Sequence, residues 1–236
     1  MRRMMDYGYN ERLFSGGIRA KIHYSRFHWL ARSLASLKCQ PRRVLELGCF
    51  DGKTINFLPV MPDAYLGLDA NWEGGLEIAR ANWKTHKAFR FVNCVTPDDV
   101  PSNERFDVCI CMETLEHVPP EMLERYLAKL SELTESYIFI TVPNEKGLVF
   151  ALKHLFKKVA KGDSLDCTAS EFINQTLGRM QKVQRDEHKG FDYDVVVAAT
   201  STYFDVIDVS PYPMRALPTA FGFGVGIIAQ KRGRSR

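Results

Sequence analysis

The chain has 236 residues, of which 45% are hydrophobic and 25% are charged, and its formal net charge is +4. These proportions are typical of a globular protein with one full-sized core. No apolar run approaches the roughly twenty residues that cross a bilayer, and the first residues lack the apolar stretch of a secretory signal. The six cysteines follow no metal-binding or disulfide spacing. We therefore expect one domain over residues 1–236, reduced and cytoplasmic.

Short apolar runs alternate with helical patterns through the first 145 residues. A helix is expected directly after Gly52, another over residues 73–84, and a third from Pro119 onward, where proline suits a first helical turn. The runs that predict strands are 42–47, 64–68, 89–93, 106–111 and 137–142. This alternation predicts βαβ units, and hence an α/β fold with a doubly wound, mostly parallel sheet.

The second half of the chain is less regular. Residues 148–159 have helical periodicity, and Thr168–Glu171 matches a capping box that predicts a further helix. Residues 192–201 fit a helix or a strand, and two late strands are expected over 204–209 and 222–230. In the first of these helices, apolar residues at 148, 152, 155, 156 and 159 share one side, and lysines at 153, 157 and 158 project from the other.

Two segments outside the sheet are interpreted by their position. Residues about 10–38 are expected to form an N-terminal cap helix, and residues about 145–190 a helical lid over the substrate. The lysines over residues 146–161 are most simply a solvated helix face, and a secondary hypothesis is that this segment rests on a membrane surface.

The strongest functional signal is the segment that starts at Glu46, where glycines follow the first predicted strand. Such glycines let the backbone turn sharply and approach a ligand closely, but dinucleotide-binding proteins share this feature. The carboxylate of Glu46 makes a pyrophosphate a poor fit. The ammonium and sulfonium of S-adenosylmethionine (SAM) suit it better. The residues of this turn expected to contact SAM are Glu46, Gly48, Cys49, Phe50 and Gly52.

A second acid, Asp69, ends the second predicted strand about seventeen residues after Gly52. An acid at this place accepts the hydroxyls of an adenosine ribose, and Asn71 is expected nearby. NAD-binding proteins share such an acid, so the combination of Glu46 with Asp69 is what favours SAM over a nicotinamide cofactor.

These segments resemble the class I SAM-dependent methyltransferases. Residues 46–52 look like motif I of that family, Asp69 like the acid of motif II, and residues 106–111 like the fourth strand. The resemblance covers residues 42–145 and implies a Rossmann-like methyltransferase fold, a seven-stranded sheet whose last strand is antiparallel. Phe50 departs from the pattern because it replaces the usual middle glycine. Residues 93–95 lack the usual acid for the adenine amine, so the backbone around Val95 is expected to make that contact.

Within this class, residues 111–119 are similar to the ubiquinone-biosynthesis O-methyltransferases, which implies that Met112 contacts the cofactor. The expected reaction is O-methylation of a small or lipid-linked hydroxyl compound, such as a quinone precursor, a glycolipid or a polysaccharide sugar. A nucleic-acid partner is not expected, because the basic residues gather largely on one helix and the C-terminal tail. A non-catalytic SAM-binding protein remains an alternative.

The candidate catalytic residues are Glu113, Glu116 and His117. His117 is expected to act as the general base, since its imidazole titrates near neutral pH. Glu116 is expected mainly to bind backbone amides near the start of the following helix. The same residues are similar to those of metal-dependent small-RNA terminal 2′-O-methyltransferases, an alternative in which Glu113, Glu116, His117 and His188 hold a divalent ion. Arg26 is expected to meet the carboxylate of SAM.

Overall fold

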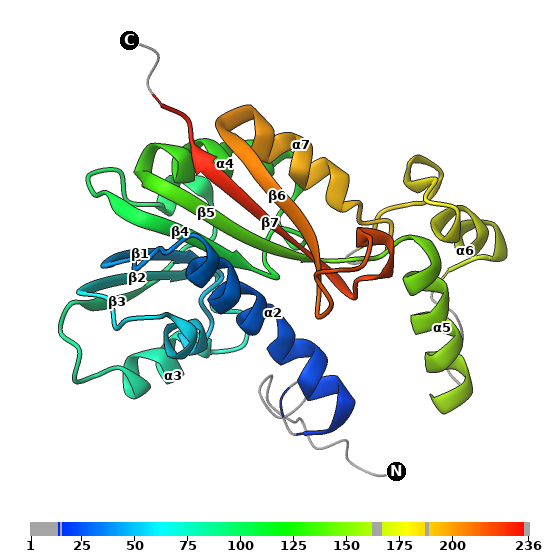
Figure 1. The fold of residues 1–236 in the computed structure, drawn as a ribbon, viewed down its shortest axis with the longest axis horizontal. Coiled ribbons are helices and arrows are strands. Elements are labelled where there is room, and N and C mark those ends of the chain that lie inside the picture. Colours follow the sequence, from blue (N-terminus) through cyan, green and yellow to red (C-terminus); the bar gives the residue numbers. More distant parts are fainter. Residues whose placement is uncertain (1–13, 15, 162–166, 187–188, 234–236) are drawn as a thin grey trace.

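Seven strands form one sheet in the computed structural model, which describes residue 14 and residues 16–161, 167–186 and 189–233 (Figure 1). Their order is β3-β2-β1-β4-β5-β7-β6. The strands are β1 (Arg43–Leu47), β2 (Ala64–Asp69), β3 (Phe89–Asn93), β4 (Phe106–Met112), β5 (Thr134–Pro143), β6 (Phe204–Tyr212) and β7 (Gly224–Lys231). All neighbouring pairs are parallel except those made by β7, which runs antiparallel to β5 and β6. The predicted seven-stranded Rossmann-like fold is confirmed.

The order of the strands creates a switch point. From β1 the chain moves outward to β2 and β3, and then returns to place β4 on the other side of β1. Connections therefore leave the carboxyl ends of β1 and β4 in opposite directions, which opens a crevice between them. Ligands of open α/β sheets bind in such a crevice.

Helices cover both faces of the sheet (Figure 1). Because side chains of a strand alternate between its two faces, Leu45 and Leu47 of β1 belong to one buried cluster and Val44 to the other. The first cluster includes side chains of α4 (Pro120–Leu133) and α7 (Tyr193–Tyr203), and the second includes side chains of α2 (Gly17–Ser36) and α3 (Gly75–Asn82).

The C-terminal half of α2 packs against β6 and β7. Trp29, Leu30 and Leu34 are fully buried. The indole of Trp29 lies where a Cβ on Gly226 would collide with it, and its N–H donates to Ser210 Oγ at 3.1 Å. The N-terminal half of α2 extends beyond the sheet (Figure 1).

The structure corrects the prediction for the segment after Gly52 and resolves the ambiguity of residues 192–201. The helix expected after Gly52 is only a 3-10 helix, η1 (Lys53–Phe57). The β-branched residues Thr54 and Ile55 and the nearby Pro59, which has no N–H, disfavour a longer α-helix there. The ambiguous residues 192–201 are helical, because Asp192 caps α7 by accepting from the amide of Asp194 at 3.1 Å.

An extension beside the sheet consists of α5 (Gly147–Lys161), α6 (Ala169–Thr176) and η3 (Met180–Lys182). Two short 3-10 helices, η2 (Pro97–Asp99) and η4 (Thr219–Phe221), lie in loops elsewhere. The predicted capping box is present, as Thr168 accepts from the amide of Glu171 at 3.2 Å. Within the described residues, no helix combines the length and the apolar character needed to span a bilayer.

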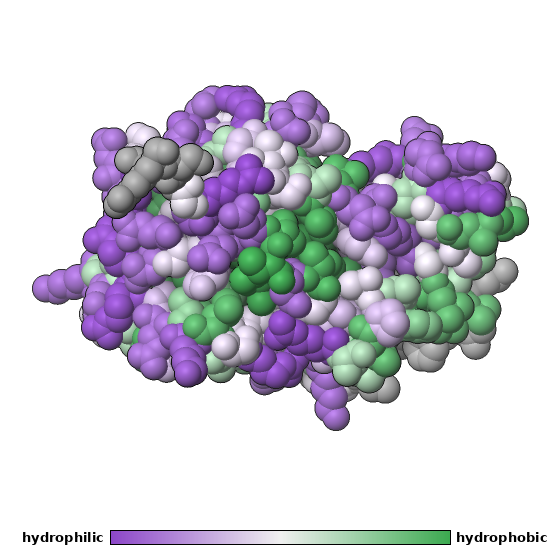
Figure 2. All heavy atoms as spheres, turned by 45° about the horizontal axis from the view of Figure 1, so that its top comes forward, coloured by the Kyte–Doolittle hydropathy of each residue, from purple (hydrophilic) through white to green (hydrophobic). Residues whose placement is uncertain are grey.

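The orientation expected for α5 is wrong. Leu148, Leu152 and Leu155 are each more than half exposed, whereas Lys153 turns inward. Together with Ile173 of α6 and Leu177 directly after it, these leucines contribute to the apolar surface of the α5–α6 extension (Figure 2). The side chains of residues 156–161 lie outside the described part of the structure.

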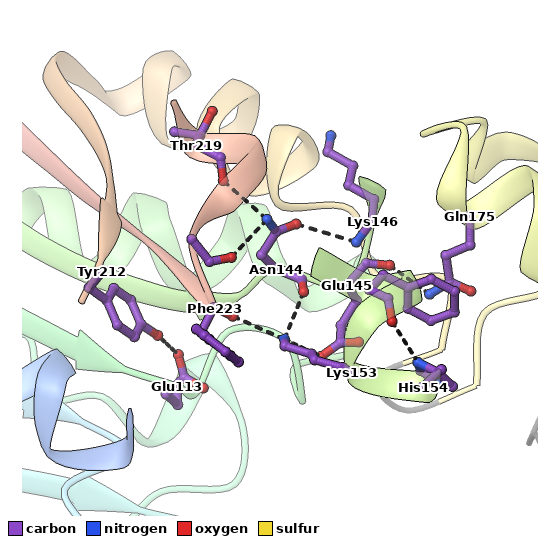
Figure 3. Close-up of polar contacts among 12 residues, drawn as sticks. Glu113, Asn144, Glu145, Lys146, Lys153, His154, Gln175, Tyr212, Thr219 and Phe223 are labelled. Atoms are coloured by element: carbon purple, nitrogen blue, oxygen red, sulfur yellow. Dashed lines mark hydrogen bonds and ion pairs between the residues drawn. The ribbon is translucent and has the colours of Figure 1, made fainter. Parts of the chain in front are cut away.

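Lys153 turns inward because backbone oxygens there need a donor. Its ammonium donates to the carbonyl oxygens of Asn144 at 2.9 Å and Phe223 at 3.0 Å, where β5 ends and β7 begins (Figure 3). Lys146 is also engaged, with its ammonium 2.5 Å from a carboxylate oxygen of Asp192 and 2.5 Å from one of Asp194. These two lysines therefore fix the base of the extension and are not a free basic face.

Candidate active site

A cleft of about 960 Å³ lies at the carboxyl ends of β1, β2 and β4, at the switch point of the sheet. This volume is at the upper end of the range for small-molecule sites, which leaves room for a cofactor and a second ligand. Its walls come from the turn after β1, the ends of β2 and β4, the loop before α4, and α2. Of the sequence-predicted site residues, the cleft is lined by Glu46, Gly48, Cys49, Phe50, Asp69, Val95, Met112, Glu113, Glu116 and His117.

The turn after β1 requires glycine at Gly48, whose φ is +78°. A Cβ at this position would collide with the side chain of Thr114. The Thr114 hydroxyl in turn lies 3.2 Å from the carbonyl oxygens of Leu47 and Met112 and joins the ends of β1 and β4. The backbone therefore comes close to the cleft without a side chain in between.

Phe50 is accommodated by a left-handed backbone and a turned-away ring. Its φ is +45°, and its ring lies where a Cβ on Gly75 would collide with it, at the start of α3. The amide of Phe50 donates to Asp69 Oδ2 at 2.9 Å. The turn thus differs from the usual glycine-rich form and still reaches the acid that ends β2.

The carboxylate of Asp69 is held in a fixed orientation. Besides the bond from Phe50, its Oδ1 accepts from the amide of Asn71 at 2.7 Å. Each oxygen keeps capacity for a further donor. The side chain of Asn71 is turned elsewhere, since its Oδ1 accepts from the amide of Leu76 and its Nδ2 donates to Glu77.

Asn71 and Gly52 lie outside the cleft lining and serve the surrounding structure instead. Asn71 connects β2 to α3 through the bonds just described. Gly52 has a φ of +71°, and a Cβ there would lie 2.9 Å from the indole nitrogen of Trp83. Their expected cofactor contacts stay predictions.

Glu46 lies beneath the turn in a fully buried, hydrogen-bonded position. Its Oε1 accepts from the hydroxyl of Thr54 at 2.6 Å, and its Oε2 accepts from the hydroxyl of Tyr65. Burial raises the pKa of Glu46 to about 8. Sequence inspection missed both partners, although the parallel register of β1 and β2, which pairs Glu46 with Gly67, brings Tyr65 near it.

The raised pKa of Glu46 has a measurable consequence for stability. The fold favours the protonated carboxyl, so this stabilisation is complete below the ordinary pKa of about 4.5 and is lost as the pH rises through about 8. Relative to Glu46→Gln, the wild type should lose about 4 kcal/mol of unfolding free energy between pH 5 and pH 9 (~1.4 kcal/mol per pKa unit).

Denaturant unfolding of both proteins at these two pH values checks this expectation, with exposed Glu132→Gln as the control. Parallel pH dependences for wild type and Glu46→Gln would show that Glu46 is ionised throughout.

The backbone amide of Val95, expected to meet adenine, is already engaged. It donates to Asp99 Oδ2 at 2.9 Å, and the amide of Thr96 donates to the same oxygen at 2.8 Å. Cys94 and the half-exposed Val95 side chain still line the cleft. Their surfaces remain as a wall against which an adenine ring can lie.

Met112 ends β4, Glu113 follows it directly, and both line the cleft. The sulfur of Met112 accepts from the hydroxyl of Thr141 at 3.8 Å. Glu113 has a φ of +54°, its amide donates to the Thr141 carbonyl oxygen at 2.9 Å, and its Oε1 accepts from the hydroxyl of Tyr212 (Figure 3). Glu113 is therefore held by the end of β6, far away in sequence.

Glu116 is the unusual group of the site. Its side chain is 1% exposed and lines the cleft, yet no other described residue donates a hydrogen bond to either carboxyl oxygen. Of the expected bonds to backbone amides, only that of its own amide acts on the carboxyl among the described residues, and it lowers the pKa less than burial raises it. Burial raises the pKa of Glu116 well above its ordinary value, and the charge of Glu113 raises it further. The imidazole Nε2 of His117, whose side chain is 41% exposed, lies 3.9 Å from Glu116 Oε1.

The metal alternative rests on Glu113, Glu116, His117 and His188. Among the residues that the structure describes, no three His, Cys, Asp or Glu side chains are grouped as a metal site. His188 lies outside the described residues, and Glu113 is directed toward Tyr212.

Cationic side chains from α2 and η1 close the cleft. Arg26 is buried, and its guanidinium carbon lies 5.0 Å from the ring centroid of Phe27. Lys53 lies 3.4 Å from a carboxylate oxygen of Asp51. Both cations line the cleft, and the charge of Arg26 acts on Glu46, whereas the expected contact of Arg26 with the carboxylate of SAM stays a prediction.

The sequence from residue 18 to residue 198 matches the family described as a methyltransferase domain. The chain belongs to this methyltransferase family. S-adenosylmethionine is therefore the cofactor, and both predictions, of family and of cofactor, are confirmed.

Relatives of this methyltransferase share parts of its sequence. It is 29% identical over 136 residues to the ubiquinone biosynthesis O-methyltransferase of Neisseria meningitidis, a match that covers 51% of this chain and only 54% of that protein. It is 26% identical over 188 residues to the enzyme of the same name from Bordetella pertussis, which covers 76% of this chain and 77% of the relative.

A similar fold is seen in the crystal structure of a SAM-dependent methyltransferase from Clostridium acetobutylicum. The TM-score is 0.63 at 11% sequence identity, and the match covers 95% of this chain and 99% of that chain.

Proposed function

We propose that this methyltransferase transfers the methyl group of SAM to an oxygen of a small or lipid-linked hydroxyl compound. The observation that carries the proposal is Glu116, a buried carboxyl to which no other described residue donates a hydrogen bond, in the cleft that Asp69 and Gly48 also line. A buried unpaired polar group is costly, and a ligand hydroxyl would satisfy it. The name shared by the two relatives supports oxygen as the acceptor atom.

The residues present fit the cofactor. Asp69 would receive the ribose hydroxyls, and the backbone at Gly48 would lie against the amino-acid part. An ammonium beside Glu46 would favour the ionised form of its carboxyl, and Arg26 would pair with the cofactor's carboxylate. When bound, SAM supplies a methyl group that its sulfonium already activates, so the protein has to align the acceptor and remove its proton.

Glu116 is proposed as the group that takes this proton. A carboxylate whose pKa is raised is a stronger base than an ordinary one, and it removes a hydroxyl proton more effectively. His117, half exposed beside it, would pass the proton to solvent. Glu113, fixed by Tyr212, adds negative charge that keeps the pKa of Glu116 high.

The apolar surface of the α5–α6 extension favours a lipid-linked acceptor. Leu148, Leu152 and Leu155 offer a continuous apolar stripe, because residues three and four apart share one side of a helix. Contact with a membrane surface through this stripe is part of the same proposal. The lysines expected for such contact, Lys146 and Lys153, are engaged elsewhere.

The test is transfer of labelled methyl from SAM to a panel of phenols, catechols, sugars and glycolipids, with and without detergent micelles. We expect formation of S-adenosylhomocysteine (SAH) together with a labelled ether. Absence of turnover with every acceptor class, or a product labelled on nitrogen or sulfur, would overturn the proposal.

Replacing His117 separates its role from cofactor binding. His117→Ala should lower kcat about 10- to 100-fold, because the proton path to solvent is lost. The calorimetric Kd for SAH should remain within a factor of two to three. If kcat and SAH affinity fall together, His117 has a structural role instead.

A further inference from the structure

One side of α2 carries three nitrogen-bearing side chains toward the cleft. Arg19, His23 and Arg26 are spaced four and three residues apart, a spacing that places side chains on the same side of a helix. All three line the cleft. Along the axis, Arg19 lies roughly 10 Å beyond Arg26, at 1.5 Å per residue, on the part of α2 that extends past the sheet (Figure 1).

The surroundings of this side of α2 are positive. Burial lowers the pKa of His23 to about 4, and the charges of Arg26, Arg19 and Lys153 lower it further. The charged groups that act on the imidazole are therefore three cations. Lys153 comes from α5, where its ammonium is held by the carbonyl oxygens of Asn144 and Phe223 (Figure 3).

The two arginines serve different ends of the cleft. Arg26 lines the cleft, and its charge lowers the pKa of both Glu46 and Glu116, which is the end where the proposed function places the amino-acid part of the cofactor. Arg19 lies two helical turns further out, with no carboxylate of a described residue within ion-pair distance. The cofactor has one carboxylate, which the first arginine suffices to bind.

We propose that Arg19 and His23 form an anion subsite for the acceptor, which binds a carboxylate or phosphate group carried by the molecule that is methylated. This inference rests on the proposed function and adds the substrate class, an acidic hydroxyl compound. A guanidinium binds either anion through two parallel hydrogen bonds, and the neutral imidazole adds an N–H donor. An anion between these groups would also relieve the repulsion among the cations.

The test measures, by calorimetry, how tightly SAH-saturated protein binds three probes of similar size, namely benzoate, phenyl phosphate and phenol. At least one of the two anions should bind ten times more tightly than phenol. Inorganic phosphate is titrated separately, and weaker binding than phenyl phosphate is expected because the ring should occupy the acceptor part of the cleft.

Arg19→Gln should reduce the advantage of the anionic probe over phenol to threefold or less. Lys21→Gln removes the same charge from an exposed position of α2 outside the cleft and should leave that advantage unchanged. Arg19→Lys should retain part of it, and SAH affinity should be the same in all variants.

Three results would overturn the inference. The first is that phenol binds to wild-type protein as tightly as both anions. The second is that the anionic probe keeps its advantage over phenol in Arg19→Gln. The third is that Arg19→Gln weakens binding of SAH and not of the anionic probe, because that guanidinium would then belong to the cofactor. SAH binding is measured first, and a wild-type protein that does not bind SAH would instead refute the proposed function.

Discussion

Asp69→Ala is expected to weaken SAH binding by at least about a hundredfold. The carboxylate would accept two ribose hydroxyls, and a hydrogen bond to a charged group contributes roughly 1.5–3 kcal/mol, so losing both corresponds to two or more powers of ten in Kd. The same carboxylate accepts the amides of Phe50 and Asn71. Its removal would therefore also release the turn that forms the floor of the site. Calorimetric titration with SAH measures the effect.

The matched control for this variant is Asp63→Ala. Asp63 is an exposed aspartate that pairs with Arg42 at 2.6 Å and lies outside the cleft. Its removal should leave the SAH affinity unchanged. Asp69→Asn should also lose most of the affinity, since an amide nitrogen would face the N–H of Phe50 or Asn71. An unaltered heat of SAH binding in Asp69→Ala would mean that the ribose is bound elsewhere.

Glu116→Gln is expected to lower kcat by about 10² to 10⁴, the usual contribution of a positioned general base, with little change in the Kd for SAH. The amide has a similar shape and cannot take a proton. The pKa of Glu116 is raised, so the fraction ionised grows as the pH increases through that raised value. Wild-type kcat should therefore rise with pH, and Glu116→Gln should lose this rise.

The measurement is a pH profile of kcat under saturating SAM for both proteins. Glu121→Gln, an exposed acid in the first turn of α4, is the control and should keep the wild-type profile. If Glu116→Gln keeps the same rise with pH and instead binds SAH weakly, Glu116 holds the cofactor and another group accepts the proton.

Local sequence patterns predicted that the turn after β1 and Asp69 lie together at one edge of the sheet. The apolar run of β1, the glycine turn and Asp69 at the end of β2 are neighbours in sequence, and a parallel sheet brings the carboxyl ends of its strands to one edge. Their positions in the cleft thus follow from the alternation of strands and helices. Phe50 shows the limit of the pattern, because only the position of Gly75 allows its ring to turn away.

Long-range partners were not predictable from spacing. Tyr212, the last residue of β6, donates to Glu113 across 99 residues, although β5 and β7 lie between β6 and β4 in the sheet. Lys153 faces inward because the ends of β5 and β7 present backbone oxygens, a fact that helical periodicity does not contain. The same holds for Arg19, whose relation to the cleft depends on where α2 crosses the sheet.

The attachment of α2 through Trp29 divides this helix mechanically. Its inner half is fixed to the sheet by the indole beside Gly226 and the bond to Ser210, whereas its outer half extends beyond the sheet (Figure 1) and contributes Arg19 and His23 to the cleft lining. A rigid swing of the whole helix would break the buried contacts of Leu30 and Leu34. We therefore expect that, when SAH is exchanged for SAM, only the outer turns of α2 bend or fray. These turns carry Arg19 and His23.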